Sequence, residues 1–175
     1  LCVRELPQGE LDMLRSLKIA TAAFVALLGL LHVVGNLANL EAAMGFVGVV
    51  TAGGEQPFYR LFGPPAMSGI LHGLALALIL LGELTVAGLA LAAVLMMLRS
   101  RSAEPHLFAV ATRPAVAACA VGMLLWFGIF IIVGEGYFML WQSEAGAGPI
   151  AGAMRYGTVC GMFMLFLLLA PDTDR

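Results

Sequence analysis

Four titratable side chains lie inside otherwise apolar stretches of the sequence: His32, Glu83, Glu135 and Arg155. Titratable groups are costly within a bilayer, so each one needs a partner, water or a function. An arginine can hold a carboxylate through two parallel hydrogen bonds, so we predict that Arg155 pairs with Glu135 or Glu83, or bridges both. Such a pair is either a buried lock that fixes the fold or part of a site for a ligand, an ion or a proton.

The depths of these groups can be compared, because an α-helix rises about 1.5 Å per residue. For the first three predicted helices, depth is measured from the basic residue at the helix end, and for the fourth it is measured from Pro171. On this scale His32 lies at about 21 Å, Glu83 and Arg155 at about 24 Å, and Glu135 at about 33 Å. A hydrocarbon core is about 30 Å thick, so the first three share a layer of the outer half and Glu135 lies just above. If Glu135 forms the ion pair with Arg155, we expect Glu83 to be protonated or to face a water-filled cavity.

Two histidines invite comparison with haem ligation, since His32 and His72 are expected on neighbouring helices. His72 lies about 40 Å from the basic end of its helix, far above His32, so the two would meet only if that helix bends. We therefore interpret His72 as a hydrogen-bonding residue near the interface. The three cysteines, Cys2, Cys119 and Cys160, have no metal-ligand spacing and are interpreted as small core residues. We expect no cofactor and no metal site.

Three further side chains are expected near the outer surface: Asn36, Trp141 and Gln142. Trp141 follows a long apolar run and would anchor in an aromatic belt at the interface. We therefore interpret the stretch "IIVGEGYFMLWQSE" as the outer end of a helix, with Glu135 available to Arg155.

The elements that position these residues must suit a bilayer. The chain of 175 residues is 61% hydrophobic and 11% charged, with a mean hydropathy of +0.97, whereas a soluble domain carries about 25% charged residues. A lipid bilayer is the expected surrounding, and the lack of a basic block argues against nucleic acid. We predict an all-α integral membrane four-helix bundle, because four stretches hold the ~20 apolar residues a crossing requires: residues 16–37, 66–98, 114–140 and 149–170.

Orientation follows from the basic residues, which gather on one side of the predicted bundle. That side carries Arg4, Arg15, Lys18, Arg99, Arg101, Arg113 and Arg175, and the other carries Arg60 and Arg155. Both termini are therefore expected in the cytoplasm. The connection over residues 40–65 and a short turn over residues 144–148 are expected to face outward.

Several local features refine this outline. Residues 42–51 are too short to span and are predicted as a short interfacial helix in the outer loop. Pro64 and Pro65 are expected to begin the second long helix, and Pro114 the third. Small residues spaced by four predict close helix contacts at three pairs: Gly88 and Ala92, Ala118 and Gly122, and Gly157 and Gly161.

The N-terminal region reads as an extension followed by an anchor. The stretch "MLRSLKIATAAFVALLGLL" from Met13 is short, basic and then apolar, as at a natural start. No A-x-A cleavage site follows, so we interpret it as a retained helix. Residues 1–12 are treated as an extension that need not be natively translated, and residues 13–175 as one domain.

The chain resembles a bacterial family of predicted small integral membrane proteins, a domain of unknown function, from about Met13 to Asp172. The resemblance is carried by "GEGYFMLWQS", by Arg155 in "AMRYG", by Glu83 in "LGELT" and by His72 at the start of a helix. It implies four helices and a bacterial inner membrane, and it implies no activity.

The resemblance weakens in the outer loop. The stretch "NLANLEAAMGFV" begins at Asn36 and is similar to the family's loop opening, but Asn39 stands where the family has an acidic residue. A histidine usual in the following helix is missing near residues 48–49. These departures argue against a metal or proton site carried by the loop.

Three functions remain open from the sequence. The first is a non-enzymatic accessory subunit of a larger bacterial membrane complex, respiratory or photosynthetic, with lipid and other membrane subunits as partners. The second is a small transporter, channel or ion- or proton-binding bundle that uses Glu83, Glu135 and Arg155. The third is a haem- or quinone-binding electron carrier that uses His32 and His72.

Overall fold

The computed structural model describes residues 7–51 and 69–170, and the described chain is helical throughout, apart from short connections. Four of its helices are long and apolar enough to cross a membrane, which confirms the predicted all-α architecture. The third of these is continuous but changes from α to π geometry partway. The elements are α1 (Gln8–Ala38), α2 (Leu40–Thr51), α4 (Gly69–Arg99), α5 (Pro105–Gly122), η1 (Met123–Tyr137), η2 (Leu140–Gln142) and α6 (Glu144–Leu169).

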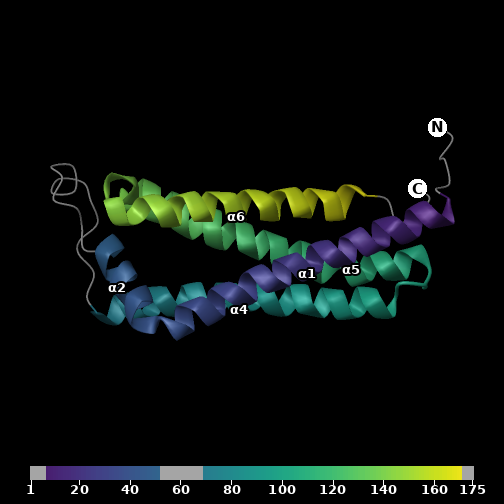
Figure 1. Cartoon of the computed structure of the whole chain (residues 1–175), viewed down its shortest axis with the longest axis horizontal. Helices are drawn as coiled ribbons and strands as arrows, with labels where there is room; N and C mark the ends of the chain where they lie inside the picture. The colour runs from purple at the N-terminus through teal and green to yellow at the C-terminus, as the bar shows by residue number, and fades with distance from the viewer. Residues whose placement is uncertain (1–6, 52–68, 171–175) are drawn as a thin grey trace.

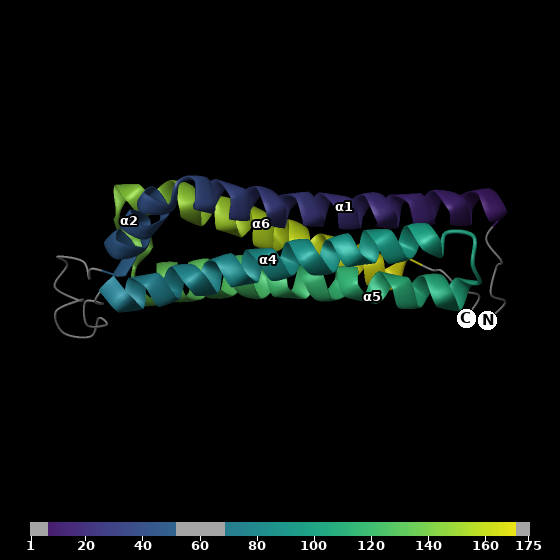
Figure 2. The same ribbon diagram turned by 90° about the horizontal axis from the view of Figure 1, so that it is seen from below.

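The long helices run up and down in a slender bundle (Figure 1). The first helix begins and the last helix ends at one end of the bundle, which we call the terminal end; the link from α4 to α5 lies there too. Helix α2 lies at the opposite end, the α2 end, beside the turn from η1 to α6 (Figure 2). The arrangement brings α1 against α4 and α6 against η1 along their lengths.

Small residues let the helices approach closely. Alanines fill much of the buried core, among them Ala22, Ala90 and Ala118. Helices α1 and α4 approach closely at Gly29 of α1, where a Cβ atom would lie 2.8 Å from the backbone nitrogen of Ala87 on α4. Without a hydrophobic drive between helices in lipid, such backbone contact is a main source of packing energy.

Two of the three predicted small-residue pairs lie at helix contacts. A Cβ at Gly122 would meet Cys160, and a Cβ at Gly157 would meet Phe127. The third pair is different, because Gly88 and Ala92 are exposed and nothing lies within 4 Å of a Cβ at Gly88. That face of α4 is directed away from the rest of the bundle.

Several predicted helix boundaries were wrong. The first helix begins at Gln8, so it runs through the boundary we placed after residue 12. The third begins at Pro105, where a missing N–H costs nothing, and Pro114 lies inside it. The predicted outer turn over residues 144–148 is instead the first turn of α6, because the Ser143 hydroxyl accepts a hydrogen bond from the Gly146 N–H and caps the helix. Pro64 and Pro65 lie outside the described residues.

The π-helix η1 is the least expected element. It extends α5 by 15 residues, and its last bond runs from the Phe138 N–H back five residues to the Val133 carbonyl at 2.9 Å. Long π segments are rare and are associated with functional sites. The chain then turns at Met139, whose φ of 50° is left-handed, before η2 and α6. The wider turn changes which side chains of η1 face the bundle.

Two basic side chains tie the terminal end together. Arg15 is 4% exposed and donates to the carbonyl oxygens of Arg101 and Ala103 at 2.6 and 3.1 Å, in the link between α4 and α5. Lys18 is buried and donates to the Ala170 carbonyl at 2.8 Å, at the end of α6. A cation near the carbonyl groups at the C-terminal end of a helix is favourable. Both side chains therefore stabilise the terminal end by binding backbone carbonyl groups near the ends of other helices instead of facing water.

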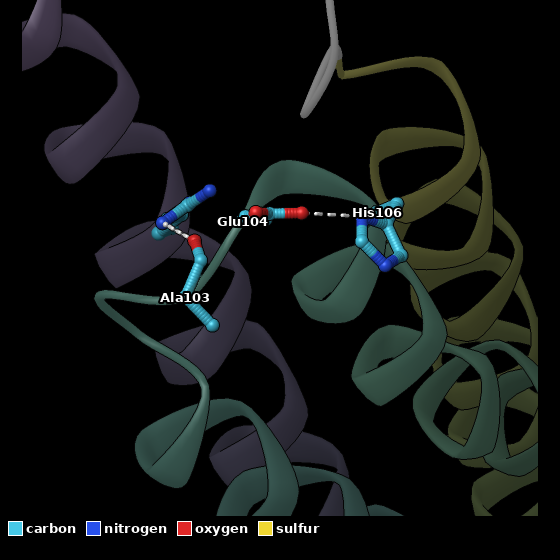
Figure 3. Close-up of polar contacts among 4 residues, drawn as sticks. Ala103, Glu104 and His106 are labelled. Carbon is cyan, nitrogen blue, oxygen red and sulfur yellow. Dashed lines mark hydrogen bonds and ion pairs between the residues drawn. The ribbon is translucent and has the colours of Figure 1, made fainter.

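The link itself carries an exposed pair. His106 and Glu104 lie 3.3 Å apart, and both side chains are mostly exposed (Figure 3). An exposed pair of this kind contributes little to stability.

Candidate intramembrane site

A buried carboxylate and an amide join α1 to α4. Glu83 is 1% exposed, midway along α4, and the Asn36 side-chain nitrogen donates to its two oxygens at 2.9 and 3.0 Å. The close approach at Gly29, two turns before Asn36, brings the helices near enough for this contact. A buried carboxylate without a partner would be costly, so Asn36 supplies the polar partner that Glu83 needs.

An aromatic cluster stands beside this pair. The His32 ring packs edge-on against Tyr156 of α6 at 4.7 Å and against Trp126 of η1 at 5.3 Å between centroids. Trp126 and Tyr156 also contact each other, at 5.7 Å. His32 and Asn36 are four residues apart on one face of α1, so the cluster and the carboxylate pair share one layer of the bundle.

A partly open pocket of about 220 Å³ adjoins both groups. Its wall draws on α1, α2, α4, η1 and α6, so no single helix makes it. The lining is mainly apolar and aromatic, with two strongly polar members on α1: its residues include His32, Asn36, Phe46, Ile79, Trp126 and Ala153.

The hydrogen bonds of His32 and Asn36 determine what each offers to the pocket. The Nδ1 atom of His32 lies 2.8 Å from the Leu28 carbonyl oxygen, which only accepts, so Nδ1 carries the proton. In the neutral ring, Nε2 is then an acceptor. The amide nitrogen of Asn36 is committed to Glu83, which leaves its carbonyl oxygen as a second acceptor. Both residues line the pocket, so its lining includes two side chains that each have an acceptor outside these hydrogen bonds.

Arg155 does not make the predicted ion pair. Its side chain is exposed on α6, and Nε donates to the Ala151 carbonyl of the same helix at 3.1 Å. No ion pair joins it to Glu83 or Glu135 in residues 7–51 and 69–170. The stem of a helical side chain runs toward the helix N-terminus, so Arg155 reaches along α6 toward the α2 end instead of across the bundle.

Glu135 also lies apart from the pocket. It is half-buried near the end of η1, and it makes no hydrogen bond within the described residues. Of the predicted polar layer, the structure therefore brings together His32 and Glu83, and it adds Asn36. Glu135 and Arg155 are left outside this group.

The remaining predicted residues lie toward the α2 end. His72 faces α2, where a Cβ at Gly48 would lie 3.7 Å from its ring, and its Nε2 atom is buried without a partner in the described chain. Trp141 is 61% exposed in η2, and Gln142 contacts the Met139 sulfur at 3.7 Å. His72 and His32 have different neighbours, so the described geometry does not pair them.

Three members of this layer were missed or misplaced by sequence reasoning. Asn36 was assigned to the outer surface, because the first helix was ended one residue after it. Trp126 and Tyr156 were not singled out among the residues of the predicted spans. The available signal was the spacing of Gly29, His32 and Asn36, which places a small residue and two polar residues on one helical face.

Comparison with known proteins identifies a family. A family model described as "Predicted small integral membrane protein (DUF2165)" matches residues 14–170, which is most of the chain. This confirms the family resemblance inferred from the sequence. No curated protein and no solved structure matches the chain.

Proposed function

The chain belongs to this family of predicted small integral membrane proteins, and from that premise we propose that it is a membrane-embedded binding protein that catalyses no reaction. Its site is the pocket lined by His32 and Asn36, with Glu83 behind Asn36. The lining offers hydrogen-bond acceptors and aromatic surfaces, which bind and orient a guest. This is the binding alternative drawn from the sequence, with His32 and Asn36 in place of Glu135 and Arg155.

One observation carries the proposal: a polar pair inside the bundle borders a pocket instead of being sealed by apolar side chains. A pair that served only to hold two helices together would be most stable when enclosed. Here Asn36 contacts Glu83 on one side and lines the pocket on the other. Polar groups placed within a membrane span at such a cost are by default candidates for a functional site.

Native mass spectrometry after gentle extraction from the source membranes tests the proposal. The expected result is a small molecule bound in a fixed ratio to the wild-type chain. Ala43 of α2 lines the pocket, so Ala43→Phe should fill it and abolish the adduct. The matched control is Ala42→Phe, an exposed position on the same helix that does not line this pocket. A wild-type chain without any adduct contradicts the proposal.

A second candidate, an accessory subunit of a larger bacterial membrane complex, respiratory or photosynthetic, is favoured by two exposed features. Arg155 lies on the outer face of α6 about 22 Å along the helix from Ala170, a depth within a core about 30 Å thick. Gly88 and Ala92 form an exposed face on α4 suited to close contact with another helix. In the same mass spectra, stoichiometric protein partners would support this candidate.

The proposed setting is the bacterial inner membrane, with both termini in the cytoplasm. The terminal end carries Arg15, Lys18, Arg99 and Arg101, and basic residues favour the cytoplasmic side. A membrane-impermeant thiol reagent tests this on single cysteines placed at Ser100 and Ser143. Labelling of Ser100→Cys in intact cells would contradict the orientation.

A further inference from the structure

We propose that the pocket binds the hydroxylated ring of a membrane-soluble molecule of the quinol class; this inference rests on the proposed function. The observation behind it is the pairing of two hydrogen-bond acceptors with a wall of aromatic side chains.

The polar residues of the pocket favour a guest that carries a hydrogen-bond donor. His32 Nε2 and the Asn36 carbonyl oxygen both accept hydrogen bonds, for the reasons given above. A guest that carries only carbonyl groups would leave these acceptors unsatisfied, and a buried polar group without a partner is unfavourable. An anion would also be repelled by the nearby Glu83 carboxylate when that group is charged. A hydroxyl group satisfies both requirements.

The walls favour a flat ring. Trp126 and Phe130 of η1 and Phe46 of α2 line the pocket, with aliphatic side chains between them. Aromatic rings bind other rings in stacked or edge-on arrangements. A metal cation fits poorly, because hard cations take about six or more oxygen ligands and this pocket offers few oxygen atoms.

The size of the pocket and its place in the fold limit the guest further. Pockets for drug-sized ligands measure about 300–1,000 Å³, and this one is about 220 Å³. It therefore suits one substituted ring, and because the pocket is partly open, a tail can extend outward. The pocket is formed by residues of the four spans together with α2, and its lining is mainly apolar, which suits a ligand dissolved in the bilayer.

A matched pair of ring compounds tests the proposal. Duroquinol has two hydroxyl donors, whereas duroquinone has the same methylated ring and no donor. Thermal unfolding of the full chain in lipid nanodiscs would be followed, without oxygen, by a thiol-reactive dye. Cys119 and Cys160 are buried, so they report unfolding, and a Cys2→Ser background removes the third thiol.

We expect duroquinol at about a hundred times its Kd to raise Tm by about 5 °C or more. Duroquinone should change Tm by less than about a degree, since small shifts of that size reflect weak binding. His32→Phe keeps the edge-on packing with Trp126 and Tyr156 but loses the acceptor, so it should lose the duroquinol shift. Ala43→Phe should lose it as well, and Ala42→Phe should keep it.

The outcomes separate this inference from the proposed function. Equal shifts with duroquinol and duroquinone, or an unchanged shift in His32→Phe, overturn recognition through a donor. If neither compound shifts Tm while native mass spectrometry finds another adduct that Ala43→Phe removes, the binding function stands and the quinol class is wrong. If His32→Phe does not fold, His32→Leu replaces it, because leucine also lacks a hydrogen-bond acceptor; a duroquinol shift in that variant as large as in the wild type overturns the role of the ring nitrogen.

Discussion

Replacing Gly29 with alanine should separate α1 from α4 and disturb the intramembrane site. The added Cβ would lie 2.8 Å from the Ala87 nitrogen and 2.9 Å from the Glu83 carbonyl oxygen. Both are backbone atoms, so no side chain can move aside. Ordinary contact begins near 3.4 Å, so the two helices must part locally by about 0.6 Å.

The energetic cost follows from that displacement. Forced overpacking of a well-packed core costs about 1–3 kcal/mol. If the same 0.6 Å is transmitted to Asn36, its 2.9 Å bond to Glu83 becomes about 3.5 Å, which is beyond a normal hydrogen bond. Hydrogen bonds between membrane helices contribute about 0.6 kcal/mol on average and about 1.7 at most. We therefore expect a loss of about 2–4 kcal/mol in the free energy of unfolding.

Equilibrium unfolding in mixed micelles of lipid and detergent measures this loss. The control is Gly35→Ala, on the same helix, where nothing lies within 4 Å of the new Cβ. Because alanine favours helix more than glycine does, the control should be neutral or slightly stabilised. Equal stability of the two variants would refute the reasoning, because the close contact at Gly29 would then carry no energy.

Three other substitutions test single contacts in the same assay. Arg155→Ala should change stability by no more than about 0.5 kcal/mol, since the side chain is exposed and bonds only its own helix; a loss of about 3–5 kcal/mol would restore the buried ion pair expected from sequence. Gly146→Ala should destabilise the turn into α6, because its Cβ would collide with the Leu140 carbonyl oxygen, whereas Gly148→Ala should not, and similar midpoints would contradict the described turn. Arg15→Met should cost about 2 kcal/mol or more, because it removes the two hydrogen bonds that the charged side chain donates through Nη1 to the Arg101 and Ala103 carbonyls, and an unchanged midpoint would contradict these bonds.

The four spans could be predicted because their physical cause is local: a bilayer demands about 20 apolar residues and satisfied backbone groups. The ends of the helices were harder to predict, because polar residues such as Gln8 continue a helix beyond its last apolar residue. The first helix was ended at residue 37 for the same reason, and Asn36 was then assigned to the surface.

The pairing of polar groups failed for a different reason. Counting residues gives the height of a side chain along its helix but not the direction in which it faces. Arg155 and Tyr156 share nearly the same height, yet Tyr156 packs against His32 while Arg155 is exposed on the outer face. The π geometry of η1 adds to the problem, because a 3.6-residue period assigns its faces wrongly. Directions of this kind depend on contacts between helices that are distant in sequence.

The bond from Lys18 to the Ala170 carbonyl has a consequence for biosynthesis. Lys18 leaves the ribosome before Ala170, and the carbonyl that it binds is made 152 residues later, at the end of α6. The terminal end therefore reaches its final form only after α6 has entered the membrane. A chain halted before that point can insert its first helices, but it lacks this contact between α1 and the end of α6. Quality-control proteases that recognise incompletely assembled membrane proteins would then act on a chain whose terminal end has not yet formed this bond.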